Sequence, residues 1–184
     1  MNSNKIIEHK FNNKKKYSFI IEWIIPVVAA LFIAILINKF IIFNVYIPST
    51  SMAPIINVGD RLMINRVYNK DNIKRGDILV FYSEELQETL IKRVIGLPGD
   101  KIIINDGVVN VNGQNIEEDY IKNNDYSDEE LIYDVPEGKY FFLGDNRPVS
   151  KDSRRWINPY IDEDDIKGKV ILRFYPIKDF GSVH

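Results

Sequence analysis

The longest apolar stretch of the chain lies near its start and runs from Phe19 to Phe43. Within it, residues 23–37 carry no charged side chain, and Glu22 and Lys39 flank them. A helix needs roughly 20 apolar residues to cross the hydrocarbon core of a bilayer. A buried core helix without charge would be rare in so small a protein, and no small-residue site follows cleanly, as it would in a cleaved secretory signal. We therefore expect one uncleaved transmembrane anchor over residues 18–43.

Beyond the anchor, the pattern changes to short runs of apolar, β-branched and aromatic residues that are separated by turn signals. The pairs Asp106-Gly107 and Asn112-Gly113 are strong hairpin signals, because two-residue hairpin turns favour these residue types. The pattern predicts a mainly β fold, a coiled antiparallel β-sheet domain that is open or barrel-like, preceded by one N-terminal transmembrane helix. The expected strands are Arg61–Val67, Asp77–Tyr82, Thr89–Ile95, Lys101–Ile104, Val108–Val111, Tyr140–Leu143 and Lys169–Phe174.

The distribution of charge gives the anchor a direction. Residues 1–16 carry five lysines and one glutamate, a net charge of +4, whereas the whole chain carries −2, so the remainder carries −6. Basic residues that flank a membrane span stay on the cytoplasmic side. We therefore expect a basic cytoplasmic segment over residues 1–17 and a β-rich domain over residues 44–184 on the other side of the membrane.

The amino-acid composition argues against several kinds of catalytic and metal site. The chain has no cysteine, which excludes disulfides, thiolate zinc sites and cysteine nucleophiles. Its two histidines, His9 and His184, lie near opposite ends, so a histidine-based triad or a multi-histidine metal site is not expected. An acidic body with a small basic head also differs from the broad basic face of a nucleic-acid binder. We expect no cofactor, no metal and no nucleic-acid partner.

Two short segments carry candidate chemistry. Ser49, Thr50 and Ser51 stand between two prolines just after the anchor, so this segment is extended or turned, as an ordinary polar turn would also be. Strand alternation puts Lys92 on one face with apolar neighbours. Burial would lower the pKa of this lysine, and a neutral lysine is a competent general base. An edge strand with Lys92 in solvent fits the same pattern.

A third segment, from Gly144 to Arg155, is densely polar and follows an apolar strand. It is either a solvated loop or a wall of hydrogen-bonding groups around a site. Within it, Asp145, Asp152 and Arg154 could pair bidentately, and Ser150 could orient a neighbouring lysine. Residues 115–130 are also polar and acidic, and we expect them to form a solvated surface excursion.

Together these segments resemble the type I signal peptidases, the bacterial leader peptidases, in their single-anchor form. The resemblance covers nearly the whole chain, and one departure is Ile55-Ile56, where the family usually has Thr and Leu. The motifs that carry it occur in order: Ser51-Met52-x-Pro54, Arg75-Gly76-Asp77-Ile78, Lys92-Arg93-Val94-Ile95-Gly96 with Pro98-Gly99-Asp100, and Gly144-Asp145-Asn146-Arg147-x-x-Ser150-x-Asp152-Ser153-Arg154.

The resemblance implies a role for each candidate residue. Ser51 would be the nucleophile and Lys92 the general base of a serine endopeptidase with a Ser-Lys dyad. The Ser51 backbone N–H and the Ser49 hydroxyl would stabilise the oxyanion, and Ser150 would hydrogen-bond the lysine. The remaining supports of the site geometry would be Asp145, Arg147, Asp152 and Arg154.

The resemblance also implies a substrate and a place in the cell. The substrates would be exported preproteins, cleaved after small residues in an Ala-x-Ala pattern at the outer membrane surface. The enzyme would lie in the bacterial cell membrane with its amino terminus in the cytoplasm. Phe43 and Ser51 are eight residues apart, a reach of at most about 26–29 Å, so Ser51 should stay near the lipid bilayer.

Two other functions fit part of the pattern. One is a Ser-Lys maturation peptidase with a single dedicated substrate. The other is a catalytically inactive β-domain that is tethered at the cell surface and binds a partner. A self-cleaving repressor would be cytosolic, and the anchor argues against it. The sequence leaves open the preferred preproteins, any sister enzymes and the oligomeric state.

Overall fold

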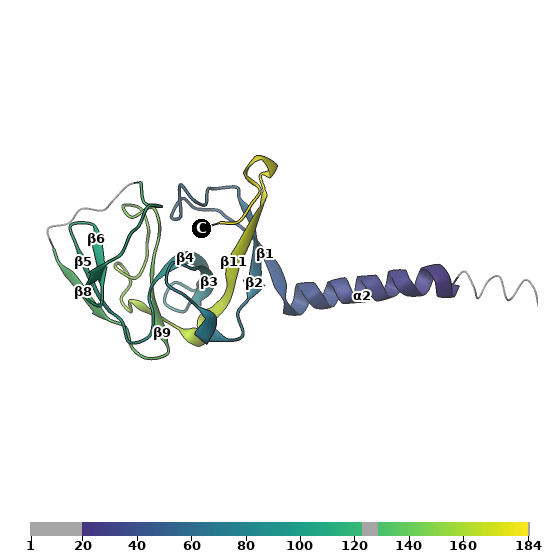
Figure 1. The fold of residues 1–184 in the computed structure, drawn as a ribbon, viewed down its shortest axis with the longest axis horizontal. Helices are drawn as coiled ribbons and strands as arrows, with labels where there is room; N and C mark the ends of the chain where they lie inside the picture. The colour runs from purple at the N-terminus through teal and green to yellow at the C-terminus, as the bar shows by residue number, and fades with distance from the viewer. Residues whose placement is uncertain (1–19, 123–128, 184) are drawn as a thin grey trace, which may run out of the picture. The chain divides into compact units, whose positions relative to one another are not determined.

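The structure is a computed structural model that describes residues 20–122 and 129–183. The chain divides after Ile42 into two compact units, an apolar helix and a β-rich domain (Figure 1). The expected cytoplasmic segment, residues 1–17, lies outside the described residues.

The first unit begins with a π-helical turn, η1 (Ile20–Ile24), and continues as α2 (Ile25–Phe40). Ile21–Phe40 has a mean hydropathy of 2.3, and within the described ranges it is the one helix long and apolar enough to cross a bilayer. None of the α2 side chains is buried in the protein. Pro26 stands at the start of α2, which directly follows the π-helical turn.

The apolar run does not stay helical to Phe43. Residues Ile42–Tyr46 form a strand, β1, which joins the main sheet beside β2. Phe43 and Val45 pack, half-buried, against the core of the domain. The last residues of the expected anchor are therefore part of the β-rich domain, because they gain both a strand partner and an apolar surface.

The main sheet of the second unit has seven strands. The neighbouring strands from β2 to β10 pair antiparallel, which confirms the mainly antiparallel β fold. In spatial order the strands are β1, β2 (Arg61–Arg66), β11 (Ile166–Tyr175), β3 (Ile78–Ser83), β4 (Glu88–Gly96), β9 (Lys139–Leu143) and β10 (Tyr160–Asp162). The short 3-10 helices are η2 (Lys70–Asn72), η3 (Glu163–Asp165) and η4 (Ile177–Asp179).

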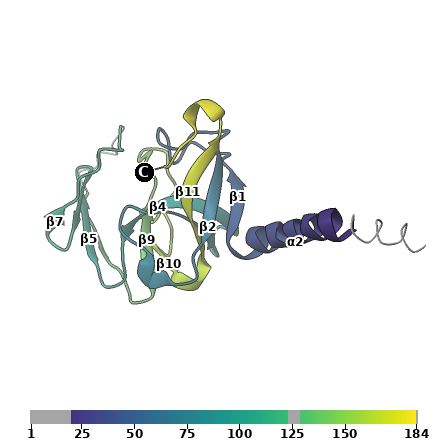
Figure 2. The same ribbon diagram turned by 45° about the vertical axis from the view of Figure 1, so that its right-hand side comes forward.

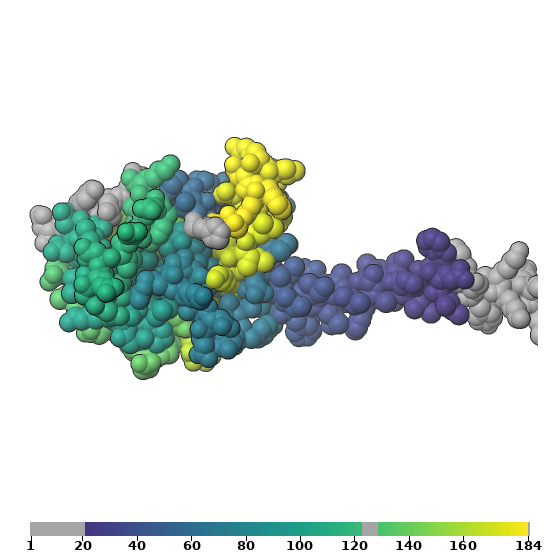
Figure 3. All heavy atoms as spheres, in the orientation of Figure 1, coloured from purple at the N-terminus to yellow at the C-terminus, as the bar shows by residue number. Residues whose placement is uncertain are grey.

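A second, four-stranded sheet lies on the opposite side of this domain from β11 (Figures 2 and 3). Its order is β7 (Gln114–Asn115), β6 (Val108–Val111), β5 (Lys101–Asn105) and β8 (Leu131–Asp134). Asp106 and Gly107, with φ of 45° and 76°, form the turn between β5 and β6, as the hairpin signal predicted. Neither sheet closes on itself, so the domain is open and not a barrel.

The strand register decides what lies near β4. Lys92 of β4 is opposite Leu79 of β3, in the interior of the sheet, which buries it among apolar strands. On the other side of β4, Arg93 is opposite Leu143, the last residue of β9. The polar loop that begins at Gly144 therefore starts beside Lys92 and Arg93.

Candidate active site

The side chains of Ser51 and Lys92 meet inside the domain, although 41 positions separate them. Lys92 Nζ lies 2.7 Å from Ser51 Oγ and also donates to the Ile91 carbonyl at 3.2 Å. Only 3% of Lys92 and 9% of Ser51 are exposed. The fold thus brings an amine and a hydroxyl into direct contact where little water reaches them.

Apolar anchoring fixes the segment that carries Ser51. Ile47, Met52 and Ile56 are buried in the same core cluster as residues of β2, β3 and β11. The Ile47 backbone also exchanges hydrogen bonds with the turn before β2, through Asp60 O at 3.0 Å and Gly59 N at 2.9 Å. Ile56, from the pair that departs from the usual family pattern, is fully buried and fills the core next to this segment.

Burial changes the protonation of Lys92. Removing the amine from water lowers the pKa of Lys92 to about 8, because desolvation disfavours the charged form. The carboxylates of Asp152 and Asp145 act against this and raise the pKa, but desolvation is the larger effect. The lysine is therefore neutral in a minority of molecules at pH 7, a far larger share than for a lysine in water.

Each of those carboxylates is held by its own arginine. Arg93 binds Asp145 through two parallel hydrogen bonds of 2.8 and 2.7 Å, and both side chains are buried. Arg154 binds Asp152 in the same two-bond manner at 2.9 and 2.9 Å. Such pairs combine charge neutralisation with fixed geometry. They limit how strongly the two carboxylates can stabilise a protonated Lys92.

The pairing of Asp152 with Arg154 fits the bidentate contact expected from the sequence, whereas Asp145 pairs with Arg93. Sequence reasoning placed Arg93 in a motif but gave it no part in the site. The position of Arg93, a charged residue directly after Lys92, was a sequence signal that Arg93 belongs to the site. Its partner becomes visible only from the register that sets Arg93 opposite Leu143.

The backbone at Gly144 passes so close to the segment that carries Ser51 that no side chain fits there. A Cβ at this position would lie 2.5 Å from the Ser51 carbonyl oxygen and 2.6 Å from Ser150 Cβ. The Gly144 N–H donates to Asp152 Oδ2 at 3.0 Å, and the Asn146 N–H donates to Ser51 O at 3.0 Å. The loop after β9 thus rests against the back of the Ser51 turn.

The two remaining serines occupy different surroundings. Ser49 Oγ lies 3.4 Å from Ser51 Oγ. Ser150 is fully buried against Gly144, but its Oγ has no hydrogen-bond partner within residues 20–122 and 129–183. The hydrogen bond that we expected between Ser150 and Lys92 is therefore not formed in this structure.

Part of the acidic excursion is not the solvated loop that we expected. Glu118 binds Arg147, which is only 2% exposed and whose Nε donates to the Gly144 carbonyl at 3.1 Å. The Tyr120 hydroxyl donates to Glu118 Oε1 at 2.7 Å, and the Tyr120 ring lies 3.9 Å from the Arg93 guanidinium carbon. Burial and the Glu118 carboxylate raise the pKa of Tyr120, which keeps its hydroxyl protonated. The sequence signal for this contact was Tyr120, an aromatic residue within an acidic segment.

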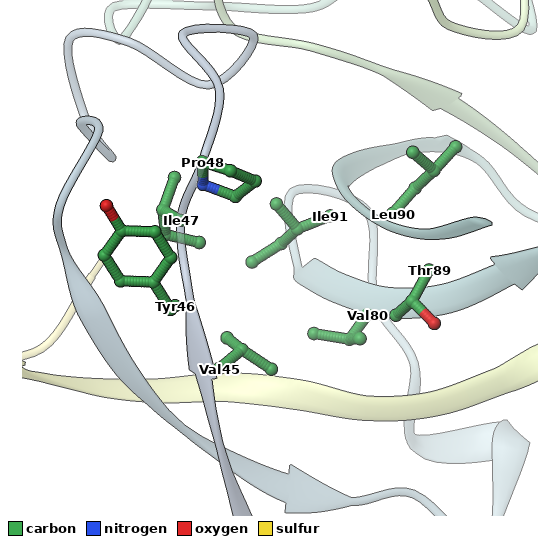
Figure 4. Close-up of a pocket in the computed structure, with 8 residues that line it drawn as sticks. All are labelled: Val45, Tyr46, Ile47, Pro48, Val80, Thr89, Leu90 and Ile91. Atoms are coloured by element: carbon green, nitrogen blue, oxygen red, sulfur yellow. The ribbon is translucent and has the colours of Figure 1, made fainter.

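A groove of about 290 Å³ lies between the segment that leads to Ser51 and the start of β4, which leads to Lys92 (Figure 4). The Ile91 side chain reaches across this space toward Ile47 and Pro48, and Val45 and Val80 face each other beside them. The walls are mostly apolar. The lining residues are Val45, Tyr46, Ile47, Pro48, Val80, Thr89, Leu90 and Ile91.

Ser51 and Lys92 thus bring a hydroxyl and a buried amine together, and an adjacent base is what activates a serine hydroxyl in general. The family described as "Signal peptidase, peptidase S26" matches residues 20–175, so the chain belongs to that family. The chain is therefore an enzyme, a peptidase that removes signal peptides, and its apolar N-terminal helix makes it a membrane-anchored one.

Two bacterial relatives are similar to this chain over most of its length. The chain is 37% identical to signal peptidase IB of Staphylococcus aureus (strain COL) over 179 residues, which covers 88% of this chain and 92% of the relative. It is 35% identical to signal peptidase I of Bacillus licheniformis over 182 residues, covering 94% and 96%. A crystal structure of a signal peptidase I from Enterococcus faecalis V583 is 32% identical and covers 53% of this chain and 96% of its own, with a TM-score of 0.47.

The close approach at Gly144 generates a prediction. Gly144→Ala adds a methyl group where backbone and Ser150 atoms already lie, so the loop after β9 or the Ser51 turn must shift. Overpacking of this kind costs typically about 1–3 kcal/mol. We expect a lower melting temperature for the full-length chain in detergent micelles and at least a tenfold loss of peptidase activity. Asn105→Ala is the control, because Asn105 is exposed at the end of β5 and its truncation displaces no buried atom. Wild-type activity in Gly144→Ala would contradict the tight contact.

Proposed function

We propose that this signal peptidase works through a Ser-Lys dyad in which Ser51 is the nucleophile and Lys92 the general base. The observation that carries the proposal is the 2.7 Å contact between Lys92 Nζ and Ser51 Oγ at a lysine that is 3% exposed. A serine hydroxyl is a weak nucleophile until an adjacent base accepts its proton. With a pKa of about 8, roughly a tenth of the Lys92 amines would be neutral at pH 7 and able to do so.

The reaction follows from this proton transfer. Lys92 takes the Ser51 proton as Oγ attacks the scissile carbonyl carbon, which gives a tetrahedral oxyanion. When the carbon–nitrogen bond breaks, the protonated Lys92 gives its proton to the leaving amine, and an acyl-serine remains. Water, deprotonated by Lys92, then hydrolyses the ester and restores Ser51.

In this proposal two donors stabilise the oxyanion. The Ser51 backbone N–H belongs to the nucleophile itself, and the Ser49 hydroxyl lies 3.4 Å from Ser51 Oγ. Donors fixed before the reaction can stabilise developing charge without reorganising, and removing one typically lowers kcat about 10²–10³-fold. Asp145, Arg147, Asp152 and Arg154 take no proton in this scheme and hold the surrounding loop.

The apolar groove supports cleavage after small residues. In an extended peptide, residues one and three positions before the scissile bond point to the same side, so both would enter the same groove. Ile47, Val80 and Ile91 narrow that space, and large side chains would clash with them. The backbones on either side could pair with the substrate by strand addition. These features favour an Ala-x-Ala substrate, an exported preprotein.

The basic charge before the anchor supports a cytoplasmic amino terminus and an extracytoplasmic catalytic domain. β1 begins two residues after α2 ends, so the chain between the apolar helix and Ser51 is short. Both observations favour cleavage at the outer surface of the bacterial cell membrane, where a signal peptide in the bilayer presents its end.

The dyad is tested by cleavage of a purified Ala-x-Ala preprotein in detergent or lipid. Ser51→Ala removes the nucleophile and Lys92→Ala removes the base, so each should lower kcat about 10³-fold or more while the chain stays folded by circular dichroism. Lys101→Ala, an exposed lysine on β5, is the matched control and should keep wild-type turnover. Substantial processing by Lys92→Ala would refute the dyad.

The same assay separates the alternatives. A maturation peptidase with one dedicated substrate would leave a panel of general Ala-x-Ala preproteins uncut. Family membership favours an enzyme over an inactive binding domain. Retention of cellular function by Ser51→Ala would support the binding domain instead.

The short connection between helix and domain gives a further prediction. A flexible linker of about 20 residues inserted after Ile41, between α2 and β1, leaves β1 intact. It lets the distance between the catalytic domain and the membrane surface vary. We expect cleavage of membrane-inserted preproteins to fall at least several-fold, while cleavage of a short soluble peptide stays within twofold of wild type. Equal activity on both substrates would show that the anchor length does not matter.

A further inference from the structure

Glu118 and Tyr120 contact the charged residues that surround the Ser51–Lys92 pair, yet neither contributes to the groove. We propose that they are positioning residues: together they clamp the β4 strand to the loop after β9 and so set the distance between Ser51 and Lys92. The proposal rests on the dyad described above and adds a residue pair that the chemistry does not use directly.

The first half of the clamp is the ion pair between Glu118 and Arg147. Arg147 is only 2% exposed, and a buried cation without a carboxylate partner is strongly destabilised. Arg147 Nε binds the Gly144 carbonyl at 3.1 Å, and the Arg147 carbonyl accepts from Arg154 Nη2 at 2.8 Å. Arg147 therefore contacts both ends of the Gly144–Arg154 loop, and Glu118 neutralises the charge of this arginine.

The second half is the contact of Tyr120 with Arg93. The Tyr120 ring lies 3.9 Å from the guanidinium carbon, well within the range of a cation–π interaction. The same guanidinium binds Asp145 and donates to the Gly76 carbonyl at 2.8 Å. Because Arg93 directly follows Lys92 in β4, the ring contacts a side chain of the strand that carries the base. The hydroxyl of Tyr120 donates to Glu118 and joins the two halves.

The clamped loop reaches the nucleophile through Asn146. Its backbone N–H donates to Ser51 O at 3.0 Å, and its side-chain amide donates to Thr50 O at 3.2 Å. A displacement of this loop therefore moves the Ser51 turn relative to Lys92. Errors of about 1 Å in reacting geometry can cost on the order of 10² in rate. The groove residues lie elsewhere, so substrate binding should change little.

The test uses the full chain in detergent micelles with a fluorogenic Ala-x-Ala peptide. We expect Glu118→Gln and Tyr120→Leu each to lower kcat about 10- to 100-fold with KM within about twofold of wild type. Tyr120→Phe keeps the ring over Arg93 and should recover most of the turnover lost in Tyr120→Leu. It also tests the ring contact if Tyr120→Leu fails to fold. Glu117→Gln is the matched control, because Glu117 is exposed and its change removes the same charge.

Amide hydrogen exchange supplies a readout that does not depend on activity. Glu118→Gln should speed exchange in residues 144–152 and 50–53, whereas Glu117→Gln should leave both segments as in wild type. A wild-type kcat with wild-type exchange in Glu118→Gln and Tyr120→Leu overturns the clamp, as does a raised KM with unchanged kcat. If the wild-type chain cleaves no preprotein, the proposed function fails, and the exchange data still decide whether the clamp exists.

Discussion

The contact between a buried lysine amine and a serine hydroxyl is the interaction on which the rest of the domain depends. A lysine in water is charged near neutral pH and cannot accept a proton. Inside the domain, desolvation lowers the pKa of Lys92 to about 8. The strands beside β4 provide this burial, because Lys92 lies in the interior of the seven-stranded sheet, opposite Leu79.

The charged groups around Lys92 affect its pKa, so the way in which they are paired matters. Asp145 and Asp152 raise the pKa of Lys92, and unpaired they would favour its charged form. Each is instead bound by an arginine in a two-bond geometry. Arg147 is balanced in turn by Glu118. The result is a set of buried ion pairs that orders the loop after β9 and leaves the low-pKa lysine next to Ser51.

Much of this could be predicted from the sequence because its signals are local. All seven expected strands form, Val108–Val111 with the expected bounds and the other six with shifted ends, since alternation and the Asp106-Gly107 turn are properties of neighbouring residues. β1 was missed because an apolar strand directly after an apolar helix looks like more helix. The short β7, β8 and β10 were missed because they lie in or beside polar segments.

The parts of the site that could not be predicted depend on contacts between distant segments. Arg93 and Asp145 are 52 positions apart, and the strand register brings them together; Arg147 and Glu118 are 29 apart and meet only through the fold of two loops. The tight approach at Gly144 likewise requires the Ser51 turn, which lies far away in sequence. Ser150 shows the converse, since its position in the polar run suggested a hydrogen bond to Lys92 that the structure does not form.

The most direct measurement of the central claim is a titration of the Lys92 amine itself. Full-length chain with ¹⁵N-labelled lysine side chains, in micelles, would be followed by NMR between pH 6 and pH 11, with Lys92→Met used to assign the signal. The account predicts one lysine with a midpoint near 8, well below the usual value of about 10.4. A Lys92 midpoint at or above 10 would contradict it, because the amine would then be charged at the pH where the enzyme must act.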